Sequence, residues 1–290
     1  MKLIKPGYEI IPQEKGMKGV LKQCELAGRI AYKSEDKITE DSANTFVNGI
    51  IKAGHGAVLE HGTIYLHLTI NSPEKDYEYL EKFNIVSFYF KNKYSVVNKV
   101  QDKYNDMINH YYITTNYRVI IENNKDDDLS FMCEPTEFHE KRITVKFITD
   151  TGCVREILRH RKFSFLNEST RYCNYSHDRL GKELTFVAPH WFESTSHHLL
   201  DGSVEEMSYK SYLCQCERLY MNMIEKYKPQ DVRGILPLCT KSELIATAFT
   251  SDWKHFFDLR TDIAKTGKPH PDLLQITNPL YNDFINLKFI

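Results

Sequence analysis

The stretch RHRKFSFLNESTRY, residues 159–172, gathers basic, hydroxyl, amide and carboxylate side chains into one short segment. Arg159, His160 and Arg161 are adjacent, so on a helix they would fan out over roughly 200° and repel one another. An anion among them relieves that repulsion, and phosphate matches the planar fork of arginine. Charge runs usually coat a solvated face. Here phenylalanine and leucine interleave with the charges, which favours a partly buried site for a phosphate-bearing ligand.

The spacing of these residues carries a resemblance. Arg159-His160-Arg161, seven intervening residues and then Ser169 resemble the R-H-R-x7-S signature of flavin-dependent thymidylate synthases. Two other blocks are similar to that family in the same order along the chain. They are GHGAVLEH at 54–61 and DVRGILP at 231–237, the latter followed by TAFTSDWKHFFDLR at 247–260.

The resemblance implies a fold and a reaction. The fold would be α+β, a mixed sheet flanked by helices of the thymidylate synthase-complementing protein type, in a single domain over 1–290 with a β-rich insertion at about 71–141. The reaction would be the reductive methylation of dUMP to dTMP, with 5,10-methylenetetrahydrofolate as carbon donor. FAD reduced by NADPH would be the reductant. A cytoplasmic homotetramer would share its active sites between subunits.

By the same resemblance, Arg260 is the catalytic residue, because a permanently charged guanidinium can stabilise negative charge developing on the pyrimidine. The alternative interpretation of Arg260 is an arginine at the C-terminal end of a helix that interacts with the helix dipole. Ser169 is not a nucleophile, since no adjacent base activates it. The residues expected to contact dUMP are Glu156, Arg159, Asn167, Glu168, Ser169, Thr170, Arg171, Arg233 and Arg260.

The flavin would be held by a second set, again on the basis of the resemblance. These residues are His55, Ala57, Glu60, Arg159, His160, Arg161, Asn167, Phe249 and His255. Two members have other interpretations from the sequence alone. His255 could pack beside Trp253 and Phe256 in a helix, and Glu156 of the nucleotide set could form an i, i+3 ion pair with Arg159.

The chain departs from the family pattern in three places. Asn167 stands where Glu or Gln is common, and Phe249 stands where the family usually has an asparagine. After Arg260 only His270-Pro271 remains of a longer polar block. These changes leave the nucleotide site intact and bear on the flavin and folate contacts.

Composition excludes several classes of protein. The 38 basic and 39 acidic side chains give a formal net charge of −1, which argues against binding a nucleic-acid polymer by bulk charge. No apolar run approaches the roughly 18 residues of a membrane span, and the N-terminus is too charged for a signal peptide. The seven cysteines are scattered, as in a reducing compartment. Neither Cys214 and Cys216 nor the evenly spaced histidines predict a metal site.

The elements that must position these residues follow from periodicity. Helices are predicted over 17–30, about 41–53 with Gly54 ending it, 203–227 and 251–260. Ser203 with Glu206 forms a capping box, and Ser251 is the expected cap of the last helix. Strands are predicted over 63–70, 143–149 and 243–249, and residues 151–161 are expected to be helical.

Within the insertion, the runs 85–90 and 117–121 are predicted to be β-strands, with an acidic turn at 126–128. Its many aromatic residues argue against a disordered linker. Two rival functions remain open: another nucleotide-modifying flavoenzyme, or a non-catalytic nucleotide- or RNA-binding module that stacks bases on the aromatic residues. The first predicts flavin colour without a 5-methyl product, and the second predicts no flavin.

Overall fold

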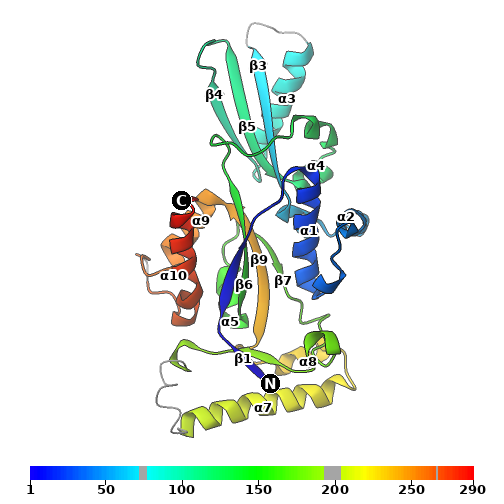
Figure 1. Ribbon diagram of the computed structural model, residues 1–290, viewed down its shortest axis with the longest axis vertical. Coiled ribbons are helices and arrows are strands. Elements are labelled where there is room, and N and C mark those ends of the chain that lie inside the picture. The colour runs from blue at the N-terminus through cyan, green and yellow to red at the C-terminus, as the bar shows by residue number, and fades with distance from the viewer. Residues whose placement is uncertain (72–76, 193–203, 266) are drawn as a thin grey trace.

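The computed structural model describes residues 1–71, 77–192, 204–265 and 267–290 (Figure 1). Its centre is a four-stranded sheet in the order β2-β6-β9-β7, in which every neighbouring pair is antiparallel. The strands are β2 (Gly7–Ile11), β6 (Arg142–Asp150), β9 (Lys241–Phe249) and β7 (Ser164–Asn167). The strands predicted over 143–149 and 243–249 are thereby confirmed.

Three helices cover one face of this sheet. They are α5 (Thr151–Ile157), α9 (Thr250–Arg260) and α10 (Pro271–Asn286). Their apolar residues enclose Phe147 of β6 and Ala246 of β9, and Trp253 and Phe256 of α9 are fully buried against them. Burial of this apolar surface, about 25 cal/mol per Å², is the main term that holds α9 in place.

The opposite face is covered by α1 (Gly16–Tyr32), with α2 (Ser42–Lys52) outside it. Ala27 and Ile30 of α1 pack on Ile245 of β9, so β9 is buried on both sides. A 3₁₀ segment, η2 (Gly56–His61), follows α2. Both helices were predicted, and Gly54 adopts φ +70° just after α2, a conformation that glycine takes without strain.

A third layer closes one end of the molecule (Figure 1). There β1 pairs in parallel with β8, and α7 carries buried Leu213 and Tyr220 beneath them. The elements are β1 (Lys2–Ile4), β8 (Thr185–Val187), α7 (Val204–Ile224), α8 (Pro229–Val232) and η6 (Arg233–Ile235), with short 3₁₀ turns η1 (Glu35–Lys37) and η4 (Asp178–Leu180). The long predicted helix is confirmed as α7. Its capping box lies outside the described side chains.

The opposite end is a lobe built on a three-stranded antiparallel sheet in the order β3-β5-β4. Its elements are β3 (Thr63–Asn71), α3 (Tyr77–Lys91), β4 (Val96–Gln101), β5 (Ile108–Asn116), α4 (Tyr117–Glu122) and η3 (Asp126–Phe131). The strand predicted over 63–70 is confirmed. The chain as a whole is α+β, as expected, with parallel pairing in β1/β8 and antiparallel pairing elsewhere in the described sheets.

Two β predictions in the insertion are wrong. The run 85–90 lies in helix α3, where Ile85, Val86 and Tyr89 turn one face onto the sheet. The run 117–121 lies in helix α4, whose first turn is capped by the side chain of Asn116. In both places packing and capping override the β preference of aromatic and β-branched residues.

The expected cap of α9 is also wrong. Ser251 lies inside the helix, and no side chain at the N-cap position bonds its first turn. Glu140, just before β6, takes that role from a distance: its Oε1 accepts hydrogen bonds from Thr250 Oγ1 and Ser251 N, each at 2.9 Å. A carboxylate there also suits the positive end of the helix dipole.

None of the described helices is long and apolar enough to cross a lipid bilayer.

Candidate active site

The order of strands and helices along the chain brings the C-terminal ends of two helices together. α5 begins where β6 ends, and α9 begins where β9 ends. Because β6 and β9 are antiparallel, the two helices start at opposite ends of the sheet and run toward each other on the same face. With seven and eleven residues they extend about 10 and 16 Å, so their last turns meet near the middle of strands about 30 Å long.

Arg260 and Glu156 occupy those last turns and bind each other. Arg260 Nη1 donates to Glu156 Oε2 at 2.9 Å, and Nη2 donates to the backbone oxygen of Glu156 at 3.1 Å. The predicted alternative for Glu156, an ion pair with Arg159, is therefore wrong. This partly buried two-point contact fixes the plane of the guanidinium group.

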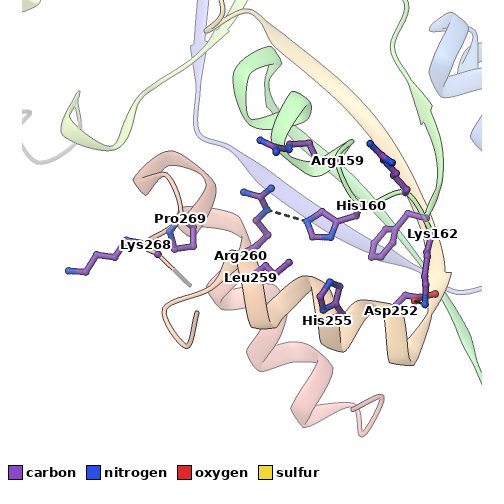
Figure 2. Close-up of a pocket in the computed structure, with 12 residues that line it drawn as sticks. Arg159, His160, Lys162, Asp252, His255, Leu259, Arg260, Lys268 and Pro269 are labelled. Carbon is purple, nitrogen blue, oxygen red and sulfur yellow. Dashed lines mark hydrogen bonds and ion pairs between the residues drawn. The ribbon is translucent and has the colours of Figure 1, made fainter. Parts of the chain in front are cut away.

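His160 supplies the third contact. Arg260 Nε donates to His160 Nε2 at 3.1 Å (Figure 2). Burial and, to a smaller extent, the positive charge of Arg260 lower the pKa of His160 to about 4. The imidazole is thus neutral at pH 7, and since Nε2 accepts, its proton is on Nδ1.

His160 and Arg260 line a cavity of about 660 Å³. His255 and Arg260 both rise from α9 toward His160, and the ring centroids of His160 and His255 are 6.4 Å apart (Figure 2). His255 is exposed to the cavity while Trp253 beside it is buried, so the packed-core alternative for His255 is wrong. The cavity is lined by five basic side chains and by one carboxylate, that of Asp252. The basic residues are Arg159, Arg161, Lys162, Arg260 and Lys268. Such a balance favours an anionic ligand.

The RHR segment is not helical, contrary to the prediction for residues 151–161. α5 ends at Ile157, and Arg159 to Arg161 lie in the turn that leads into β7. The turn exposes Arg159 and Arg161 and keeps His160 half-buried. It therefore presents both guanidinium groups to the cavity, whereas a helix would point them about 200° apart.

A second cavity of about 370 Å³ lies next to the first. Glu156 lines it, together with Asp150, His270 and Asp272. Since Arg260 lines the larger cavity and binds Glu156, the ion pair stands between the two cavities. A chemical group bound to Arg260 could thus contact one ligand in the larger cavity and another in the smaller one.

A sequence model of the thymidylate synthase complementing protein (Thy1) family matches residues 134–268, which include β6, the RHR turn and all of α9. The match covers a little under half of the chain, and over that segment the chain is similar to this family. Among similar proteins is a probable flavin-dependent thymidylate synthase of Paramecium bursaria Chlorella virus 1, 25% identical over 155 residues, which are 50% of this chain and 68% of that protein. The flavin-dependent thymidylate synthases of Pyrococcus abyssi and Pyrococcus furiosus are 28% and 30% identical over 109 residues, 37% of this chain and 41% of theirs.

A solved structure also resembles the chain. The UMP/dUMP methylase PolB from Streptomyces cacaoi bound with 5-Br dUMP aligns with 99% of this chain and 93% of its own, at 16% identity and a TM-score of 0.45. That score is too low to establish a common arrangement.

Other predicted nucleotide contacts lie elsewhere in the protomer. Ser169 follows β7 on the α1 side of the sheet, where its backbone N–H donates to Ala31 O. Arg171 is exposed beside it, and Arg233 is exposed in η6. Neither arginine, nor Ser169 or Thr170, lines the cavity around Arg260 in the same chain.

The side chains of Glu168 and Asn167 accept hydrogen bonds from other residues of the chain. The Glu168 carboxylate is buried and accepts hydrogen bonds from Tyr175 Oη at 2.8 Å and Lys241 Nζ at 2.9 Å. Asn167 Oδ1 accepts from Ser242 Oγ at 2.8 Å. The structure therefore does not support a ligand contact for Glu168, because both of its oxygens are engaged in holding the loop to β9.

The predicted flavin residues of η2 also lie outside the large cavity. His55 and Ala57 are exposed, and Glu60 Oε1 accepts from Arg118 Nη1 at 2.6 Å. Phe249, at the end of β9, packs its ring 5.5 Å from the guanidinium of Arg142. Among the described residues no group of three side chains is arranged to hold a metal ion, and Cys214 is exposed where Cys216 is buried.

Arg142 is the residue that the sequence did not reveal. It is 9% exposed, and its guanidinium donates to neutral oxygens: Glu60 O at 3.0 Å, Thr63 Oγ1 at 3.4 Å and Ser164 Oγ at 3.3 Å. Burial lowers its pKa to about 10, so it stays charged at neutral pH. It ties η2 to the start of β7. Its only signal was an arginine that opens a strand, which is too common to be diagnostic.

His160 should titrate near pH 4. The neutral form is the one that accepts from Arg260, so the folded state disfavours protonation and its stability falls as the pH drops from about 6.5 toward 4. In His160→Gln, whose amide oxygen can accept the same bond, this part of the pH dependence should vanish, a change of up to about 1.4 kcal/mol per pH unit. Urea unfolding across that range, with NMR titration of the imidazole, measures it; a His160 pKa near 6.5 contradicts the assignment.

Arg142→Met should destabilise the chain by about 2 kcal/mol, because the backbone oxygen of Glu60 loses a buried donor. Hydrogen exchange in residues 56–63 should accelerate with it. Arg118→Met is the matched control, since it removes a half-exposed ion pair with the same Glu60 and should cost less than about 1 kcal/mol. Equal losses in the two variants would show that the buried guanidinium has no special role.

Proposed function

We propose that this chain catalyses the reductive methylation of dUMP to dTMP, with 5,10-methylenetetrahydrofolate as carbon donor and FAD reduced by NADPH. The observation that carries the proposal is Arg260, held by Glu156 and neutral His160 at the edge of a basic cavity within the family-matched region. The names of the viral and archaeal relatives support the same activity.

Arg260 has the donors that this chemistry requires. A guanidinium carries five N–H groups, and the contacts to Glu156 and His160 use three of them. The remaining two can reach the oxygen and nitrogen edge of a uracil ring. There they stabilise the negative charge that develops when C5 becomes nucleophilic. Because Arg260 is already fixed, it loses little freedom when the substrate binds.

The larger cavity suits the flavin. Arg159 and Arg161 would bind its phosphates, and His160 and His255 would lie along its ring. When bound, the flavin supplies the redox chemistry that no side chain of this site can perform. The pyrimidine of dUMP is then expected at Arg260, with its 5′-phosphate away from Glu156, Asp150 and Asp272, whose carboxylates would repel it.

We propose that neighbouring subunits complete the nucleotide site. Ser169, Arg171 and Arg233 do not line the cavity of their own chain, and both arginines are exposed. Exposed Tyr172 beside Arg171 gives that surface apolar area to bury. The assembly would be a cytoplasmic homotetramer, with each single-domain chain adding its arginines to a partner's cavity.

Arg260→Ala should keep its flavin and lose turnover by about 10²-fold or more, since the lost charge acts on the developing carbanion. Tritium release from C5-labelled dUMP, with methylenetetrahydrofolate and NADPH present, measures turnover, and the visible spectrum measures flavin. Flavin colour in the wild type without tritium release or a 5-methyl product would instead favour another nucleotide-modifying flavoenzyme. An active Arg260→Ala variant would remove Arg260 from the mechanism.

Shared sites predict complementation. Arg260→Ala and Arg171→Ala should each be inactive alone, yet mixed and reassembled oligomers should recover tritium release, because some sites then combine an intact Arg260 with an intact Arg171. Arg218→Ala, an exposed arginine of α7, is the control and should stay active by itself. Absence of recovery in verified mixed oligomers would place both arginines in one subunit's site.

A further inference from the structure

A separate cavity of about 230 Å³ lies where the insertion meets Glu60. The turn between α3 and β4 contributes Asn92 and Tyr94, and the junction of β5 and α4 contributes Asn116 and Arg118. Only Glu60 comes from the η2 segment. The insertion therefore builds most of the wall of a cavity that would not exist without it, and the volume suits one ring system rather than a dinucleotide.

Asn116 offers this cavity a hydrogen-bond donor. The residue is only 4% exposed, and its Oδ1 accepts from Val119 N at 3.2 Å, which fixes the orientation of the amide. Its Nδ2 group has no hydrogen-bond partner among the residues that the structure describes. Because Asn116 lines the cavity, this group can donate to an acceptor of a ligand there in exchange for water.

The cavity wall carries one positive and two negative side chains. Arg118 binds Glu60 through Nη1 at 2.6 Å and Glu122 through Nε at 2.8 Å, so one guanidinium lies between two carboxylates. A phosphate would meet those carboxylates and gain little. A neutral ligand that both donates and accepts hydrogen bonds fits better, because the amides, the guanidinium and the carboxylates offer partners of both kinds.

Tyr94 adds an aromatic surface. Its side chain lines the cavity and is 54% exposed, so its ring is available to a ligand. A flat ring would stack on it while its edge meets Asn116 and Arg118, the combination by which proteins hold nitrogen heterocycles.

We infer that this cavity binds an uncharged heteroaromatic ring that carries hydrogen-bond donors and acceptors, of the adenine or pterin type. The choice of these two rings rests on the proposed function, whose flavin, nicotinamide and folate reactants carry them. The inference that the cavity is a ligand site rests on its geometry alone. The insertion is then a ligand-binding element that acts beside Glu60.

Asn116→Asp and Tyr94→Leu test the inference. Aspartate still accepts from Val119 N, so the cap of α4 stays while the Nδ2 donor is lost. Calorimetry would measure binding of AMP and of 5-formyltetrahydrofolate, each to the protein as purified and after flavin removal. At least one probe should bind the wild type and weaken about tenfold in both variants, the value of one hydrogen bond or one stacked ring. Tyr104→Leu, 89% exposed in the same insertion, is the control and should change nothing.

The outcomes separate the possible sources of the ring. AMP that binds only after flavin removal identifies the flavin's own adenine; AMP or the folate binding in both forms identifies a co-substrate. The inference is overturned if neither probe binds in either form, if both variants bind as tightly as the wild type, or if Tyr104→Leu weakens binding equally. Tritium release is measured separately. If probe binding depends on Asn116 but the protein has no thymidylate synthase activity, the proposed function is wrong and the cavity assignment is still supported.

Discussion

The site depends on keeping one arginine charged, half-buried and fixed in direction. Arg260 achieves this with a carboxylate, a backbone oxygen and a neutral imidazole. A second cation in place of that imidazole would repel it, so the burial that lowers the pKa of His160 is part of the arrangement. The aromatic core beneath α9 provides the burial: His160 packs its ring 4.8 Å from that of Phe256. Hydrophobic packing thus sets the protonation state on which the electrostatics rely.

The separation of the other arginines follows from a short strand. Four residues of β7 carry the chain about 13 Å along β9, and the loop after it crosses to the α1 side of the sheet. Arg159 and Arg171 are therefore on different faces although only eleven residues separate them. A single protomer cannot wrap both around one small ligand. The proposal that neighbouring chains share their sites follows from this separation.

The sequence predicted the regular core well, because α1, β3, β6 and β9 have clear periodicity or continuous apolar runs. It failed where distant residues decide. Glu140, just before the neighbouring strand β6, caps α9. Lys241 and Tyr175 donate hydrogen bonds to the buried carboxylate of Glu168. No local pattern contains those partners. A resemblance named the basic turn, His255 and Arg260 together, and the structure brings them to one cavity. Neither a pattern nor a resemblance pointed to Arg142.

Glu60 joins the insertion of some seventy residues to the rest of the chain through two separate contacts. The core holds the backbone of Glu60 through Arg142, whereas the insertion holds its side chain through Arg118. The first contact is buried and rigid, and the second is half-exposed and replaceable. Changes in the lobe can therefore reach η2 through this carboxylate, in addition to the direct packing of α4 on η2. Such an attachment lets the insertion alter what binds beside Glu60 while the geometry around Arg260, on the other face of the sheet, stays constant.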